Sequence, residues 1–187
     1  LLALSKQSAF YREWMDSFFA RDIQRLFGFR DMNRFNALFE YLLRQSGGQF
    51  EVTKTATALG ITRPTVESHL RALEITHAFT VLRPFHGGGQ SEIVKQPKIY
   101  AFDTGFVSFA RGWDPLRPED FGSLWEHVVL EHLQAHFPDT PISYWRDKPG
   151  REVDFVLTHR RDEIDAIECK WDPEAFDRSA LTLFRSY

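Results

Sequence analysis

Three charged residues in the last third of the chain have types and a spacing that suit a catalytic site. Asp154 lies in the β-like run 152–156, and Glu168 and Lys170 lie in the next such run. Fourteen residues separate Asp154 from Glu168, which is room for a strand end, a tight turn and the next strand. Alternate residues of a strand share a face, so Glu168 and Lys170 would lie together while Cys169 faces the core. Two neighbouring strands would then bring two carboxylates and one ammonium to one place.

This set predicts a metal-dependent hydrolytic site. Clustered carboxylates raise each other's pKa unless a cation lies between them. A hard cation such as Mg²⁺ takes oxygen ligands and keeps other positions for water or phosphate. The predicted ligands of Mg²⁺ (or Mn²⁺) are Asp154, Glu168 and, from a helix, Glu126. Lys170 is predicted to position the attacking water. For the Glu168–Lys170 pair alone, a solvated strand edge is the alternative.

Apolar periodicity predicts the elements that position these residues. They are a helix over about 123–136, strands over 142–145, 152–157 and 164–170, and a helix after Pro173. Asp154 is expected to point away from Val153 and Phe155, which would both face the core. A helix, three strands and a helix form an α/β core.

The middle of the chain has the pattern of a winged helix. Two short helices meet at Gly60 and Thr62, where a glycine suits the left-handed end of the first helix and a threonine caps the second. Two β-like runs follow, over 79–83 and 98–102, with a Gly-rich tip between them. A hairpin placed directly after a helix-turn-helix is typical of a wing.

This region also carries the predicted DNA contacts. Arg63, Thr65 and Arg71 lie away from the apolar stripe of the second helix, so that face is predicted to enter a major groove. Lys95 and Lys98 on the wing are predicted to contact phosphates. Winged helices also dock proteins, and this alternative stays open.

Charge and composition limit the classes of function. The 187 residues carry a net charge of −3. Residues 33–102 hold 8 Lys/Arg and 5 Asp/Glu, whereas residues 103–187 hold 10 and 17. The middle thus suits an anionic partner, and the C-terminal part would repel one unless cations were bound.

No apolar run approaches the ~20 residues of a membrane span. The single cysteine fits a reducing compartment, so a cytoplasmic protein is expected, without a membrane partner.

Several other site types find no support in the sequence. No glycine precedes a lysine, so there is no phosphate-binding loop for ATP, and no Gly-x-Ser-x-Gly elbow is present. His132 and His136 are four residues apart on a predicted helix, but a solvated helix face explains them better than a metal site. The chain stops at Tyr187 within an apolar-periodic stretch, so a fragment of a longer protein is expected.

A wider ordered set of motifs resembles one protein family. The set comprises Trp14 with 19–23, Leu59–Val66, the run Gln96-Pro97-Lys98-Ile99-Tyr100-Ala101-Phe102-Asp103-Thr104-Gly105, Tyr144–Asp147 with Gly150, and Glu152–Phe155. In this order it is similar to the domain of unknown function that follows the AAA+ module of many prokaryotic predicted ATPases. Glu126, Asp154, Glu168 and Lys170 match the PD-(D/E)xK signature of that family.

The resemblance implies a fold and two candidate functions. The fold is α/β (α+β overall): a helical lead from the ATPase lid or linker (1–32), a winged helix (33–105) and a PD-(D/E)xK restriction-endonuclease-like core (106–187), truncated at its C-terminus. One function is a DNA-binding, Mg²⁺-dependent nuclease. The other is a non-catalytic DNA- or protein-binding module that regulates the ATPase. ATP would act only through the N-terminal AAA+ module; DNA and that module are the expected partners, and a homo-oligomer is left open.

Overall fold

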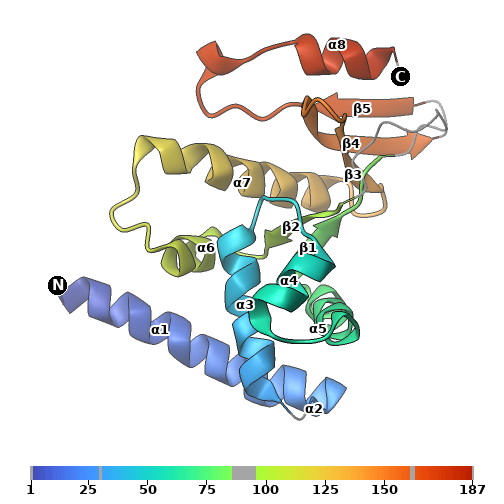
Figure 1. Ribbon diagram of the computed structural model, residues 1–187. Coiled ribbons are helices and arrows are strands. Elements are labelled where there is room, and N and C mark those ends of the chain that lie inside the picture. The colour runs from blue at the N-terminus through green and yellow to red at the C-terminus, as the bar shows by residue number, and fades with distance from the viewer. Residues whose placement is uncertain (1, 30, 86–95, 161–162, 187) are drawn as a thin grey trace. The chain divides into compact units, whose positions relative to one another are not determined.

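The computed structural model describes residues 2–29, 31–85, 96–160 and 163–186, and it is a mixed α/β structure with two small sheets (Figure 1). The chain divides into two compact units. The first contains Leu1–Ser46, Phe50–Thr80 and Ala101–Pro115, and the second contains Gly47–Gln49, Val81–Tyr100 and Leu116–Tyr187. Among the described helices, none is long and apolar enough to cross a membrane.

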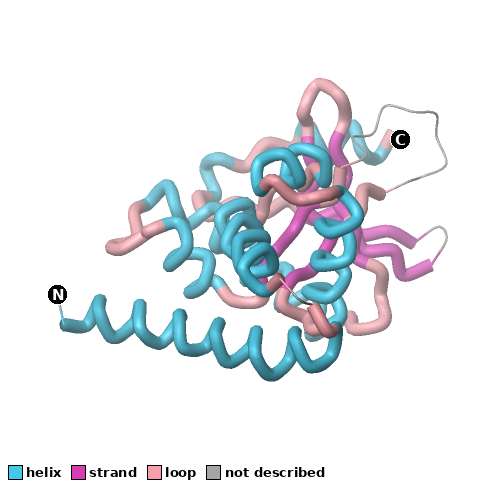
Figure 2. The backbone as a smooth tube through the Cα atoms, turned by 60° about the horizontal axis from the view of Figure 1, so that its bottom comes forward, coloured by secondary structure: helices cyan, strands magenta, loops and turns pink. Residues whose placement is uncertain are grey.

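The first unit is built almost entirely of helices, which Figure 2 shows in cyan. Its elements are α1 (Leu2–Phe18), a π-helical stretch (Phe19–Ile23), α2 (Gln24–Phe27), α3 (Met32–Gln45), α4 (Val52–Leu59), α5 (Arg63–Ile75) and α6 (Thr104–Arg111). Helix α3 buries Phe35, Leu38, Phe39, Leu42 and Leu43. This spacing of three and four residues places all five side chains on one face of the helix, where they form the centre of this unit's core.

The turn between α4 and α5 has the chemistry that the sequence predicts. Gly60 ends α4 with φ of 62°, a left-handed conformation that a residue without Cβ adopts at little cost. The Thr62 side chain accepts a hydrogen bond from the backbone N–H of Thr65 at the start of α5. Each helix therefore ends or begins at a residue that satisfies its free backbone groups.

Strands β1 (Phe79–Leu82) and β2 (Lys98–Ala101) pair in a two-stranded sheet. The Gly-rich tip predicted between them, with Lys95, lies outside the described residues. Beyond β1 the chain runs beside β3 (Ile142–Arg146), since Phe85 N–H donates to the Tyr144 carbonyl at 2.7 Å. Residues 81–100 thus belong to the second unit, whereas the sequence pattern predicts them as part of a winged helix over 33–105.

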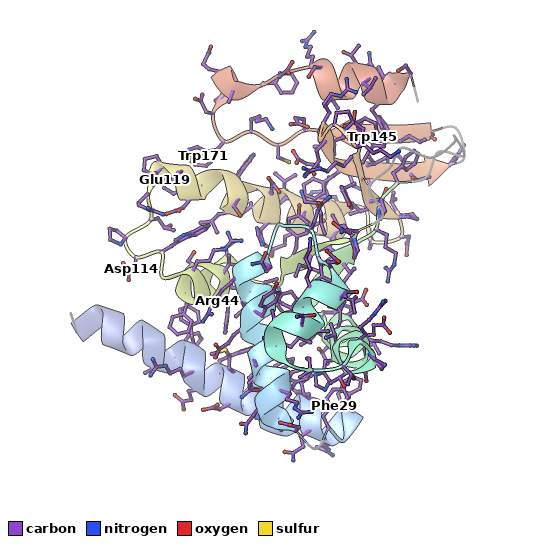
Figure 3. All side chains as sticks on the ribbon, in the orientation of Figure 1. Phe29, Arg44, Asp114, Glu119, Trp145 and Trp171 are labelled. Carbon is purple, nitrogen blue, oxygen red and sulfur yellow. The ribbon has the colours of Figure 1, made fainter. Side chains whose placement is uncertain are left out.

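The second unit is a three-stranded antiparallel sheet between two helices. Its elements are a 3₁₀ turn (Pro118–Asp120), α7 (Phe121–His136), β3, β4 (Glu152–Arg160), β5 (Glu163–Ile167), a second 3₁₀ turn (Pro173–Ala175) and α8 (Ser179–Arg185). The sheet order is β3-β4-β5. Leu130 of α7 packs with Phe155 and Leu157 of β4. Ala180 of α8 packs on the other face with Val153 and with Trp145, which Figure 3 labels. The predicted helix, three strands and helix are confirmed.

A β-bulge in β4 changes which side chains share a face. Ser143 pairs with Val156 but Trp145 pairs with Val153, so three steps along β4 match two along β3. As a result Val153 packs on the α8 side and Phe155 on the α7 side. The expectation that both residues face the core together, opposite Asp154, is corrected by this bulge. A bulge commonly re-aims a side chain next to a functional site.

Candidate carboxylate site

Asp154 lies at the bulge and is 5% exposed. Its Oδ2 atom accepts a hydrogen bond of 2.7 Å from the backbone N–H of Cys169. Strand β5 ends at Ile167, earlier than the predicted end at residue 170, and Ile167 pairs with Phe155. The Asp154 carboxylate therefore binds the chain just past the last paired residue of β5. This contact brings Asp154 beside the Glu168–Lys170 segment, as the sequence predicts.

Glu168 and Lys170 form an ion pair with each other. The Glu168 side chain is only 9% exposed, and its second oxygen, Oε2, is buried without a hydrogen-bond partner. An unsatisfied buried oxygen is costly unless a cation, a water or a donor reaches it. Lys170 is 33% exposed, so its ammonium is accessible from solvent while it pairs with Glu168.

Glu126 enters the site from α7. The Tyr100 hydroxyl donates to Glu126 Oε2 at 3.1 Å, and the ammonium of Lys98 lies 3.6 Å from the same oxygen. Lys98 and Tyr100 are alternate residues of β2 and thus share a face. All three predicted acids, Asp154, Glu168 and Glu126, are therefore in the second unit and near one another.

Lys98 belongs to this site and not to a DNA-contacting surface. Its side chain is 4% exposed, and its Nζ atom lies 2.6 Å from Glu152 Oε1. Arg146 binds the other oxygen of Glu152 at 3.0 Å. The expectation that Lys98 contacts phosphates from a wing does not fit this burial, because both of its ion-pair partners are internal carboxylates.

Three residues of this cluster were not expected there: Tyr100 and Glu152 were assigned no role, and Lys98 was assigned to the wing. The alternation of Lys98 with Tyr100, and of Glu152 with Asp154, was visible in the sequence. Alternation alone shows which residues share a face, but not which partner strand or helix covers that face.

Burial dominates the electrostatics of the acids. It raises the pKa of Asp154 above its usual range, although the Cys169 hydrogen bond and the Lys98 charge oppose this. It also raises the pKa of Glu126, to which the Asp154 charge adds, and that of Glu168. Three carboxyl groups with raised pKa values within one unit are typical of a functional site.

The same burial affects the cationic and thiol groups differently. Burial would lower the pKa of Lys98, but its contacts with Tyr100, Glu126 and Glu152 outweigh that effect and raise the pKa. For Lys170, burial acts in the same downward direction and is outweighed by Glu168, so this ammonium stays protonated. Burial raises the pKa of the Cys169 thiol to about 12, which keeps it a neutral core residue.

The donor set suits a hard divalent cation. In the described part of the chain, no three His, Cys, Asp or Glu side chains are arranged to hold a metal together. Mg²⁺, however, is commonly bound through one or two carboxylates, with waters and phosphate in its other positions. Asp154 and Glu168, with the unpartnered Oε2 of Glu168, fit such a site. Glu126 then suits a role through water better than direct ligation.

The predicted DNA contacts on α5 lie in the other unit. Arg63 and Glu67 form a loose pair at 3.8 Å, and both are more than half exposed. Thr65 hydrogen-bonds the Thr62 hydroxyl at 2.8 Å and so takes part in the helix cap. Arg71 is exposed. These positions do not test the DNA contact, which stays a prediction.

The chain is therefore a mixed α/β protein whose second unit contains a partly buried cluster of carboxylates with two lysines. Residues 2–117 match a family model described as Domain of unknown function (DUF8612), and residues 121–186 match one described as Domain of unknown function (DUF4143). The first match spans more than half of the chain, which belongs to the DUF8612 family. The second domain is often found in C-terminal regions of AAA-ATPase-like proteins. No curated protein and no solved structure matches the chain.

Proposed function

We propose that the carboxylate cluster is the site of a metal-dependent phosphodiesterase that cleaves DNA, in the C-terminal part of an AAA+ ATP-binding protein. The β4–β5 segment with Asp154, Glu168 and Lys170 would be the centre of a PD-(D/E)xK nuclease-like core. The observation that carries this proposal is the buried, unpartnered Oε2 of Glu168 beside Asp154 and Lys170. A stable fold would satisfy such an oxygen, whereas a binding site keeps it for a ligand.

Each side chain has a role that follows from its surroundings. Asp154 and Glu168 would hold Mg²⁺ or Mn²⁺, which when bound supplies Lewis acidity and a water of lowered pKa. The protonated Lys170 is a donor, so it would orient the attacking water and balance charge on the phosphate. The water oxygen would bond to phosphorus while the bond from phosphorus to the leaving sugar oxygen breaks. Glu126 would receive a proton from the attacking water, and the leaving sugar oxygen would take one from solvent water. The raised pKa of Glu126 suits a proton acceptor.

DNA affinity would come from the first unit. Its helices α4 and α5 and the turn at Gly60 follow one another in the order of a helix-turn-helix, and β1 and β2, which follow in the chain, belong in large part to the second unit. Helix α5 would be the recognition helix, with Arg63, Thr65 and Arg71 toward DNA. Residues 103–187 are acidic, so they would need both bound cations and the basic stretch 33–102 to approach a polyanion.

The second candidate is a non-catalytic regulatory module. Two observations favour it: Lys170 is already paired with Glu168, and Lys98 is already paired with Glu152. Lysines that neutralise buried acids can serve the fold alone. The unpartnered Oε2 of Glu168 is what this alternative leaves unexplained.

A cleavage assay separates the two candidates. The protein is incubated with Mg²⁺ or Mn²⁺ on single- and double-stranded DNA, beside the variants Asp154→Asn and Lys170→Met. The matched controls are Asp165→Asn on exposed β5 and Lys148→Met in the exposed turn after β3. We expect cleavage by the wild type and both controls, with loss in the two site variants. Equal DNA products from wild type and Asp154→Asn, or no cleavage together with no Mn²⁺ binding by calorimetry, would favour the regulatory module.

A further inference from the structure

Two contacts on one oxygen fix the Glu126 carboxylate. Tyr100 donates its hydroxyl proton to Oε2, and the Lys98 ammonium lies 3.6 Å from the same atom. Both contacts involve Oε2, so Oε1 is the oxygen left to serve a cation or its water. A carboxylate held by one hydrogen bond and one ion pair loses rotational freedom that a lone glutamate on a helix retains.

Lys98 is itself held in place. Its Nζ atom lies 2.6 Å from Glu152, and Glu152 is bound in turn by Arg146 at 3.0 Å. With 4% of its side chain exposed, Lys98 is enclosed by neighbouring atoms. The order of contacts runs from Arg146 through Glu152 and Lys98 to Glu126, and every member lies in the second unit.

We propose that Lys98 and Tyr100 are positioning residues of the carboxylate site, which hold Glu126 by Oε2 so that Oε1 serves the bound cation or its water. This inference rests on the proposed function for its chemistry, but its geometry is independent of it. Supporting partners around metal sites orient the ligands, and their loss commonly weakens metal affinity about 10- to 100-fold.

One consequence concerns the two family matches. Lys98 and Tyr100 lie within residues 2–117, whereas Glu126, Asp154 and Glu168 lie within residues 121–186. The site is therefore assembled from residues of both matched regions. The segment that matches DUF4143 contains the acids but not the side chains that fix Glu126.

Mn²⁺ affinity measured by calorimetry on the full chain tests the proposal. We expect Lys98→Met and Tyr100→Phe to weaken Mn²⁺ binding about 10-fold or more, and Glu126→Gln to have a similar effect. Combining Lys98→Met with Glu126→Gln should add little, because both act through one carboxylate. Lys98→Arg keeps the charge and the donors, so it should retain most of the wild-type affinity for Mn²⁺. Lys148→Met, in the exposed turn of the same unit, is the matched control and should bind as the wild type does.

Crystal structures of the wild type and of Tyr100→Phe supply a readout that needs no metal. Tyr100→Phe keeps the buried ring, so it is the variant that preserves the fold. We expect the Glu126 carboxylate to leave its position or become disordered in Tyr100→Phe and in Lys98→Met. An unmoved Glu126 in both variants, or additive losses of Mn²⁺ affinity, would overturn the inference. A wild type that binds no Mn²⁺ while Glu126 moves as expected would instead refute the proposed function and leave the positioning role standing.

Discussion

The Asp154 carboxylate accepts a 2.7 Å hydrogen bond from the backbone N–H of Cys169, which lies 15 residues further along the chain. Strand β5 ends at Ile167, so this side chain supplies an acceptor where the ladder between β4 and β5 stops. The bond gives Asp154 a structural role in addition to its proposed role as a ligand, and the two roles can be separated by substitution.

Asp154→Ala should lower the free energy of unfolding by about 1–3 kcal/mol, because the Cys169 N–H is buried and would lose its acceptor. Asp154→Asn retains an oxygen that accepts this bond, so it should stay closer to the wild type while losing the proposed cation site. Urea unfolding measures both, with exposed Asp165→Ala as the control. Equal stability of the Ala and Asn variants would show that the hydrogen bond contributes little.

The contribution of Asp154, Glu126 and Glu168 to stability should fall as the pH rises from about 4 toward neutrality. Burial raises the folded-state pKa values of Asp154, Glu126 and Glu168 above the unfolded values of about 4. Each acid then binds more protons in the folded state, so its contribution is present below the unfolded pKa and is lost as pH rises through the folded pKa.

Thermal or urea unfolding between pH 4 and pH 8 measures this dependence. Asp154→Asn cannot ionise at this position, so it should lose less stability than the wild type across that range. A wild-type profile with the same slope as that of Asp154→Asn would argue against a raised pKa for Asp154.

The double variant Arg63→Ala, Arg71→Ala should weaken DNA binding and reduce its salt dependence. Each lost phosphate contact lowers the magnitude of the slope of log K against log salt by about 1. Fluorescence anisotropy at several salt concentrations gives both quantities, and Arg160→Ala, 86% exposed on β4, is the matched control. Unchanged affinity and slope in a folded double variant would favour protein docking by this helix pair.

Gly60→Ala should destabilise the first unit by about 1 kcal/mol or more. The cause is the backbone, because φ is 62° and an added Cβ would meet no atom within 4 Å. Gly122→Ala is the matched control: it lies in α7 with open space around its Cβ position and should be neutral or slightly stabilising. Thermal unfolding of the two variants compares them directly; similar melting temperatures would contradict the role of the left-handed turn.

Local features of this protein were determined by its sequence alone. The helix around residues 123–136, the turn at Gly60 with its Thr62 cap and the antiparallel strands that carry Asp154 and Glu168 all follow from periodicity and capping over a few residues. The approach of Asp154 to the Glu168 segment was predictable too, because strands that follow one another closely in the chain commonly pair, as β4 and β5 do.

Only the tertiary structure decided which distant residues complete the site. Lys98, expected to meet DNA, is buried against Glu152 and Glu126, residues far from it along the chain. The bulge in β4 separated Val153 from Phe155, which simple alternation had placed on one face. Each outcome has its own physical reason. No local pattern specifies which element will cover a strand face, which decides the burial of Lys98, and a one-residue change in register exchanges the faces of a strand, which separates Val153 from Phe155.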